Sequence, residues 1–118
     1  MINYRQSMDQ IRSHLHKEYN LDADKIRALL PDFLSALSGY IDEMEASLAN
    51  SNQEDLIRAA HRVKGALVNL GLRELAEDAQ LVEQLARQKD RSSSGREITG
   101  QVRNLIKEMR FLTGHNPS

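Results

Sequence analysis

The chain has no cysteine and only two prolines among its 118 residues. Without cysteine it can form no disulfide, no thiol nucleophile and no thiolate metal site, and this composition is compatible with the cytoplasm. No apolar run approaches the roughly 20 residues that span a bilayer, and the N-terminal MINYRQSMDQ lacks the apolar centre of a signal peptide. The net charge of −1 argues against a strong nucleic-acid surface. We therefore expect a cytoplasmic protein that binds neither membrane nor nucleic acid.

Strand patterns are also missing, because apolar residues recur at steps of three and four almost everywhere. The length, with 28% charged residues, fits one domain over residues 1–118. The apolar stripes predict an all-α fold of five amphipathic helices, and the tail is expected to fray. In order, the stripes and the tail cover residues of about 4–19, 26–48, 53–70, 75–86, 98–112 and 114–118.

Short connections between long amphipathic helices favour antiparallel neighbours. The four helices over residues of about 22–113 are therefore predicted to form an up-down-up-down four-helix bundle, with the N-terminal helix of about 4–19 as an additional cap on one end. Pro31 lies inside the second stripe and removes an amide hydrogen bond, so we expect a kink or short break near Leu30. Gly71 is the residue type that ends helices in the left-handed conformation.

Two segments carry a sequence pattern typical of a helix N-terminus. The polar stretch NSNQED pairs Ser51 with Glu54 as in a capping box, although the neighbouring Asn52 is an alternative cap. Ser94 and Glu97 repeat the same capping-box pattern after the loop RSSSG. Both signals predict that a helix begins within a residue or two of the serine.

The segment AAHRVKGALVNLG places His61 one turn before Lys64 and Gly65. The helical spacing of apolar residues continues through this segment. Glycine in a helix interior costs about 0.8 to 1 kcal/mol relative to alanine, so Gly65 requires a reason other than helix stability. At 100° per residue, His61 lies roughly 140° from the core stripe and points to solvent. Lys64 and Gly65 share its face, as do the apolar Ile57 and Val68. The sequence therefore predicts a docking surface centred on an imidazole.

A protruding histidine with these neighbours is suited to accept a phosphoryl group. It must be uncharged when it attacks, and it must protrude because a donor aspartyl phosphate lies in a partner's pocket. An ammonium about 4 Å from a phosphate oxygen contributes roughly 4 kcal/mol at an effective dielectric constant of about 20, and less once solvent screens it. Lys64, which we expect to be exposed, follows His61 by three residues, and this spacing suits such a contact. Gly65 would let a partner's backbone come close, or it could instead allow two helices to pack tightly.

The run HRVKGALVNLG resembles the signature of histidine-containing phosphotransfer (HPt) domains, with lysine, glycine and a second glycine at positions +3, +4 and +10 from the histidine. The similarity extends over residues of about 26–86, and the last helices match in length and pattern only. The resemblance implies a four-helix bundle that carries phosphate on histidine Nε2 and exchanges it with the aspartate of receiver domains. It implies no nucleotide site and no cofactor of the protein's own, with Mg²⁺ expected on the partner receiver domain.

Position by position, the resemblance makes His61 the phosphoacceptor, Lys64 its electrostatic partner and Gly65 the clearance residue. In this family a polar residue on the next helix often contacts the other imidazole nitrogen, and Glu83 stands at that place here. Glu83 would accept a hydrogen bond from Nδ1 and leave Nε2 free, or it is a surface ion-pair member. Some members have glutamine there, so the carboxylate leaves open whether it repels the bound phosphate.

Four further residues are candidates for binding the partner. Ile57 and Val68 could contact a receiver domain, or they could be peripheral core. Arg58 and Arg62 could steer an acidic receiver surface by their charge, although a solvated helix face explains them equally well. These four residues complete the predicted docking surface.

The leading hypothesis is a phosphorelay intermediate that acts as a monomer between receiver domains of hybrid sensor kinases and response regulators, without catalytic turnover or an ATP site. One alternative is a non-phosphorylated helical adaptor of the same fold. A second is a hydrolase with His61 as general base, which would need a pocket, a nucleophile and an oxyanion site, and no such constellation is found. We expect no metal site, because His14 and His16 are two residues apart and face different directions on a helix.

Overall fold

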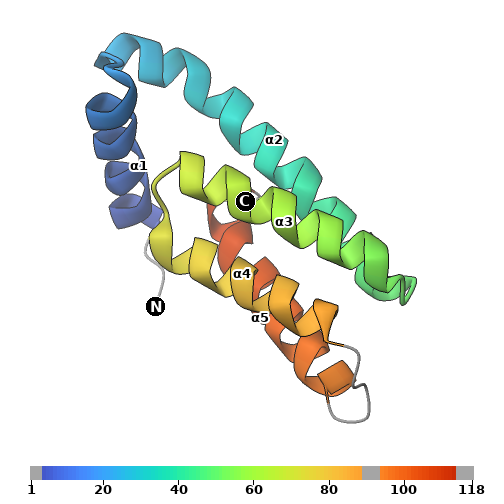
Figure 1. Ribbon diagram of the computed structural model, residues 1–118. Helices are drawn as coiled ribbons and strands as arrows, with labels where there is room; N and C mark the ends of the chain where they lie inside the picture. Colours follow the sequence, from blue (N-terminus) through green and yellow to red (C-terminus); the bar gives the residue numbers. More distant parts are fainter. Residues whose placement is uncertain (1–3, 89–93, 114–118) are drawn as a thin grey trace.

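The structure is a computed structural model that describes residues 4–88 and 94–113. Two predictions are outside what the structure describes: the fraying of residues 114–118, and the cap at Ser94 paired with Glu97, because the side chain of Ser94 is not described. The described residues contain helices and no strand, so the all-α prediction is confirmed. The helices are α1 (Tyr4–Tyr19), α2 (Ala23–Ala49), α3 (Gln53–Asn69), α4 (Arg73–Arg87) and α5 (Ser94–Thr113) (Figure 1).

Helices α2 to α5 form a four-helix bundle. Each of them lies beside two others, since α2 contacts α3 and α5, and α4 contacts the same two helices. Consecutive helices run in opposite directions (Figure 1), so the predicted up-down-up-down arrangement is confirmed. The additional helix α1 contacts α2 and α5. It crosses the end of the bundle near the α3–α4 turn, where Nε2 of Gln10 donates to the carbonyl of Gly71 at 2.8 Å.

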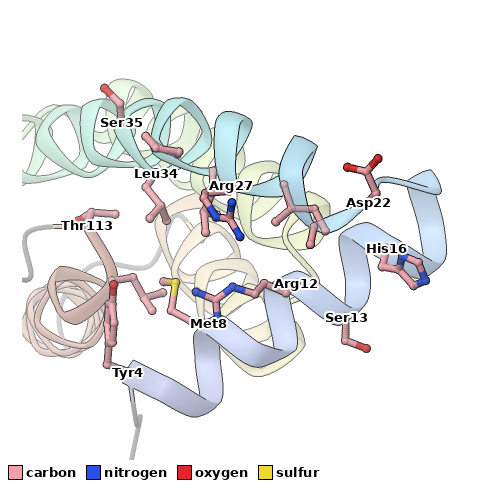
Figure 2. A pocket seen from close by; sticks show the side chains of 15 residues that line it. Tyr4, Met8, Arg12, Ser13, His16, Asp22, Arg27, Leu34, Ser35 and Thr113 are labelled. Carbon is pink, nitrogen blue, oxygen red and sulfur yellow. The ribbon is translucent and has the colours of Figure 1, made fainter.

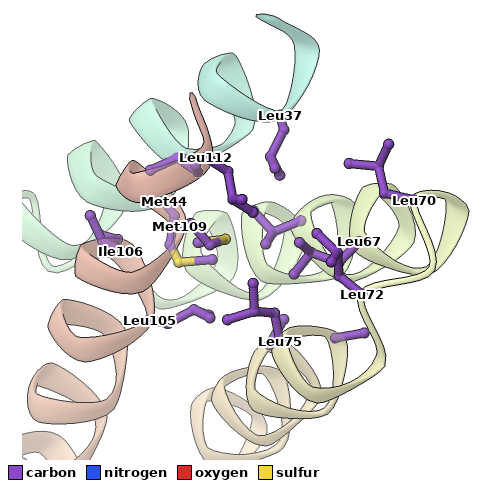
Figure 3. Packing of buried hydrophobic residues seen from close by; sticks show 14 of the residues in the cluster. Leu37, Met44, Leu67, Leu70, Leu72, Leu75, Leu105, Ile106, Met109 and Leu112 are labelled. Carbon is purple, nitrogen blue, oxygen red and sulfur yellow. The ribbon is translucent and has the colours of Figure 1, made fainter. Parts of the chain in front are cut away.

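The apolar stripes of the helices meet in one core (Figure 3). Ala60 of α3 and Ala79 of α4 are fully buried, and these small side chains let the two helices approach closely. Burying a large apolar side chain contributes about 1.5–3 kcal/mol, so the core fixes the rotation of each helix and hence which residues face solvent. Large core side chains include Ile11, Leu37, Ile41, Met44, Leu67, Leu75, Leu105 and Met109.

Of the kink or short break expected near Leu30, the break is not formed, because helix α2 continues through Pro31. Pro31 is exposed, and so is Arg27, whose carbonyl loses its amide partner to the proline ring. Water can therefore replace the missing hydrogen bond. Leu30 and Leu37 are buried on either side of the proline, and their packing keeps this part of α2 on the core.

The end of α2 and the start of α3 lie on adjacent residues, and this closeness decides which of the two predicted residues caps α3. Ser51 has a positive φ of 54° and its amide donates to the Leu48 carbonyl, while the Asn52 amide donates to the Ser47 carbonyl. These two bonds are the Schellman motif that ends a helix. The side chain of Asn52 then accepts a 3.0 Å bond from the Asp55 amide. Asn52 is thus the cap of α3, because Ser51 is already used to end α2.

Gly71 ends α3 in the left-handed conformation, as predicted, with φ of 78°. Its amide donates to the Val68 carbonyl at 3.0 Å, and the amide of Leu72 donates to the Leu67 carbonyl at 2.9 Å. A Cβ atom at Gly71 would lie only 2.4 Å from the ring of His14. The glycine therefore allows both the tight turn and the close approach of α1.

Replacing Gly71 with alanine should lower the free energy of unfolding by about 1–2 kcal/mol or more, because a left-handed alanine costs roughly that amount and its methyl group must displace His14. Urea unfolding measures the change. Gly39→Ala is the matched control, since Gly39 lies within α2 and no atom lies within 4 Å of the position that a Cβ would take there. Alanine should stabilise the chain at that position by up to about 1 kcal/mol. A Gly71→Ala variant as stable as the unmodified chain would contradict this account of the turn.

Candidate functional site

His61 lies in the middle of α3, on the side away from the core. Ala60, Val63 and Leu67 of the same helix have no exposed area, so their packing fixes the rotation of α3. The side chain of His61 is consequently 64% exposed. A large partner can therefore reach the ring without any movement of the bundle.

The imidazole of His61 is oriented by a carboxylate on the neighbouring helix. Its Nδ1 atom lies 3.3 Å from Oε2 of Glu83, which α4 presents to α3 and whose side chain is only 9% exposed. Among the described residues, none forms a hydrogen bond or ion pair with the other ring nitrogen, Nε2. A carboxylate on Nδ1 favours the tautomer that carries its proton there, which leaves the lone pair of Nε2 directed away from Glu83.

Lys64 contacts the same carboxylate from one turn further along α3. Its Nζ atom lies 3.4 Å from Oε1 of Glu83, an oxygen that makes no hydrogen bond to the described residues. The lysine side chain is only 28% exposed, so the expectation of an exposed lysine is wrong. The reason is the close packing of α3 on α4, which covers the aliphatic part of the side chain and brings its ammonium group to Glu83.

A further cation completes the cluster. Arg87, one turn after Glu83 on α4, donates a 2.8 Å hydrogen bond from its NH2 atom to Oε2 of Glu83. Burial by itself would raise the pKa of the Glu83 carboxyl, but the bond from Arg87, the charge of Lys64 and the bond from His61 outweigh it, so this pKa lies below its ordinary value. Arg87 is not among the residues predicted from the sequence, although its spacing of four residues from Glu83 on one helix is a usable signal.

Gly65 borders open space on the surface beside His61. No atom lies within 4 Å of the position that a Cβ would take, which excludes tight helix packing as the reason for this glycine. It lines a groove of about 620 Å³ between α2 and α3, together with Phe33 and Tyr40 of α2 and with Tyr19 of α1. This groove is not predictable from the sequence, because only the fold brings residues of three helices together.

The two predicted apolar docking residues differ in exposure. Val68 is 54% exposed and lies on the open side of α3. Ile57 is half-buried and packs against the core cluster. Val68 is therefore the more accessible of the two for a partner, whereas Ile57 also contributes to the bundle.

The two predicted docking arginines are both engaged in ion pairs within the chain. Arg58 pairs with Asp55 one turn earlier on α3. Arg62 reaches across to α2, where its NH1 atom lies 2.7 Å from Oε1 of Glu43. Their charges are thus partly balanced, and a partner would have to exchange these contacts to use them.

A further groove lies away from His61, at the end of the bundle (Figure 2). It has a volume of about 1170 Å³ and lies between α1 and α2, next to the end of α5, with no lining residue from α3 or α4. Arg12 and Arg27 point into it from the two helices (Figure 2) and pair with Asp9 and Asp24 at 3.3 Å. No residue of the predicted site reaches this groove.

The remaining histidines of the described chain make local contacts. Nδ1 of His16 lies 3.0 Å from the carbonyl of Leu21, and the ring of His14 packs edge-on against Tyr19 at 6.0 Å between centroids. The described residues contain no cluster of three His, Asp or Glu side chains suited to a metal ion. Nor does any helix among residues 4–88 and 94–113 combine the length and apolar character that crossing a membrane requires.

The described helices α2 to α5 thus form a bundle with an exposed histidine on α3, a lysine one turn on, and a carboxylate of α4 beside the ring. The Hpt domain family model matches residues 28–111, from α2 to α5, and leaves α1 outside. The chain belongs to the Hpt domain family. Members of this family are phosphocarrier modules in histidine phosphotransfer, and they interact with receiver domains. The comparisons with curated proteins and with solved structures found no match.

The lowered pKa of Glu83 predicts a pH dependence of stability. Because this pKa is lower in the folded than in the unfolded chain, the carboxylate stabilises the fold above the ordinary glutamate range of about 4.3. This contribution is lost as the pH falls through that range towards the folded value. Glu83→Gln should therefore lose less stability between about pH 7 and pH 3 than the unmodified chain does, as measured by urea unfolding.

Glu18→Gln is the control for this measurement. Glu18 is an exposed residue of α1 that pairs with no other described residue, so its replacement should leave the pH slope nearly unchanged. An unaltered slope in Glu83→Gln would show that the contacts of Glu83 with His61, Lys64 and Arg87 do not stabilise the fold.

Proposed function

We propose that this chain is a phosphorelay intermediate in which Nε2 of His61 takes a phosphoryl group from one receiver domain and passes it to another. The observation that carries the proposal is the exposed ring whose Nδ1 lies 3.3 Å from the buried Glu83 carboxylate. The Nε2 lone pair attacks the phosphorus of an aspartyl phosphate, the Nε2–P bond forms, and the bond from phosphorus to the aspartate oxygen breaks. The aspartate leaves as a carboxylate, and the proton on Nδ1 stays in place. The second transfer reverses these bond changes.

Lys64 supplies positive charge to the transfer. In phosphoryl transfer the charge is spread over the equatorial oxygens, so catalysis depends on positioning and electrostatics. The Lys64 ammonium already lies on the His61 side of α4, 3.4 Å from Glu83, and a small rotation of its flexible side chain would direct it to a phosphoryl oxygen. The Mg²⁺ ion of the reaction is proposed to sit on the receiver domain, and the carrier needs no ATP site and has no turnover of its own.

The proposed docking surface for the receiver domain surrounds His61. It comprises Val68, the exposed part of Ile57, and the groove on the α2 side of Gly65. Gly65 would let the backbone of the receiver domain approach the imidazole, since nothing in the chain occupies that space. Arg58 and Arg62 would exchange their internal partners for acidic groups of the receiver. We propose that the carrier works as a monomer, in the cytoplasm.

Phosphotransfer to His61 can be measured directly with a phosphorylated receiver domain as donor, taken from a panel of receivers of the same genome. The chain should acquire acid-labile, alkali-stable label, as expected for phosphohistidine, and His61→Gln should abolish it. His16→Gln is the matched control and should keep the label, since His16 lies on α1 away from the site. Circular dichroism checks that both variants remain helical.

The other outcomes of this experiment are equally informative. Label that persists in His61→Gln would move the phosphoacceptor to another residue. Binding of receiver domains without any label on the unmodified chain would favour the adaptor of the same fold. That alternative would leave the gathering of Lys64, Glu83 and Arg87 around the ring without a chemical role.

Gly65→Ala should stabilise the chain by about 0.8–1 kcal/mol, because alanine is the better helix former and its methyl group meets no atom within 4 Å. The same methyl group should weaken binding of a receiver domain, as measured by titration calorimetry. Gly100→Ala on α5 is the control, because the space there is also open, and it should not change receiver affinity. Unchanged affinity in Gly65→Ala would remove the clearance role.

A further inference from the structure

Arg87 lies beside the site but takes no part in the transfer chemistry described above. Its NH2 atom donates a 2.8 Å hydrogen bond to Oε2 of Glu83, the same oxygen that lies 3.3 Å from Nδ1 of His61. The other oxygen, Oε1, lies 3.4 Å from Nζ of Lys64 and makes no hydrogen bond to the described residues. The carboxylate is therefore placed between two cations, one on each oxygen.

Phosphorylation of His61 would change the charges around this carboxylate. A phosphoryl group brings a charge of about −1.5 to −2, and when Lys64 turns to its oxygens, less of the ammonium charge remains on Oε1 of Glu83. The Glu83 side chain is 9% exposed, so water cannot fully replace a lost cation. An unpaired carboxylate beside the phosphoryl group would also repel it. A second cation that stays on Glu83 removes both problems, and Arg87 is in that position.

We propose that Arg87 is a positioning residue for phosphotransfer, which keeps Glu83 neutralised and in contact with Nδ1 of His61 while Lys64 moves to the phosphoryl group. The inference rests on the proposed function and adds a residue to it. The exchange of ion pairs moves no proton, because Nδ1 keeps its proton and both cations stay charged. A neutral side chain at position 83 would need no such partner. Arg87 is therefore required because this chain carries a carboxylate there.

An ordinary surface ion pair on α4 is the alternative role for Arg87. Its side chain is 59% exposed, and exposed pairs one helical turn apart contribute little to stability. In that role the loss of Arg87 would leave the transfer rate unchanged. In the role proposed here the loss slows transfer, and the slowing depends on Glu83. Among the described residues, the charged groups paired with Glu83 come from α3 and from α4 itself, and none comes from α2 or α5.

The test is a double-mutant cycle on the full chain with phosphoramidate as donor. This small molecule transfers its phosphoryl group to a histidine nitrogen as its P–N bond breaks and ammonia leaves, so docking of a receiver does not enter the rate. The cycle contains Arg87→Ala, Glu83→Gln and the double variant, and Arg87→Lys tests rescue by a second cation. Arg73→Ala is the matched control, because Arg73 lies at the other end of α4 and pairs with no other described residue.

We expect Arg87→Ala to slow the labelling of His61 about three- to tenfold, the effect of a partly screened charge. Arg87→Lys should keep most of the rate. In the Glu83→Gln background, the loss of Arg87 should change the rate by less than about twofold, because no carboxylate remains to be neutralised. Arg73→Ala should label like the unmodified chain. Thermal unfolding of each variant separates a change in rate from a change in stability.

Wild-type labelling by Arg87→Ala would overturn the proposal. Equal slowing in both backgrounds would also overturn it, since Arg87 would then act without Glu83. Equal slowing by Arg73→Ala would overturn it as well, because the rate would then depend on the net charge of the protein and not on Arg87 in particular. If Glu83→Gln does not fold, Arg87→Lys against Arg87→Gln decides instead, and equal rates would overturn the proposal. Failure of the proposed function looks different, because the unmodified chain itself would then take no label on His61 from phosphoramidate or from any receiver.

Discussion

The packing of α3 against α4 is the constraint on which the site depends. Ala60 and Ala79 are buried without exposed area, and their small size brings the two helix backbones close together. His61 and Lys64 can therefore reach Glu83 across the interface. Apolar burial at about 1.5–3 kcal/mol for each large side chain outweighs surface ion pairs, which contribute about 1 kcal/mol or less. The core thus sets the geometry of the site, and the charged groups are placed by it.

The candidate site separates an exposed imidazole from a buried orienting group. The His61 ring is open to a partner, whereas the Glu83 carboxylate that contacts Nδ1 is almost covered. Burial alone would favour the protonated carboxyl, but the cations on both of its oxygens lower its pKa. Glu83 therefore stays charged at neutral pH, so it can accept the proton of Nδ1 in a hydrogen bond and orient the ring.

The two flanks of α3 differ in character. On the α4 flank, charged groups gather around Glu83 next to the imidazole. On the α2 flank, the groove beside Gly65 offers aromatic and aliphatic surface. Helix α1 lies outside the range that matches the Hpt domain family, yet Leu15 and Tyr19 line this groove. The additional helix thus covers the end of the bundle and also extends the surface next to His61.

The sequence by itself determined the helices, the bundle and the histidine with its lysine and glycine, because helical periodicity and short connections act over a few residues. It also named Glu83 as a partner of the ring, but only through the family resemblance. At Pro31 it left a kink or a short break open, and core packing on both sides of the proline keeps α2 unbroken. At Ser51 and Asn52 it left the cap of α3 open, because the end of one helix competes there with the start of the next. Only the tertiary structure decided that Lys64 is covered, that Arg87 shares the Glu83 carboxylate, and that a groove adjoins Gly65, since these contacts depend on the distances between helices that are separate in the chain.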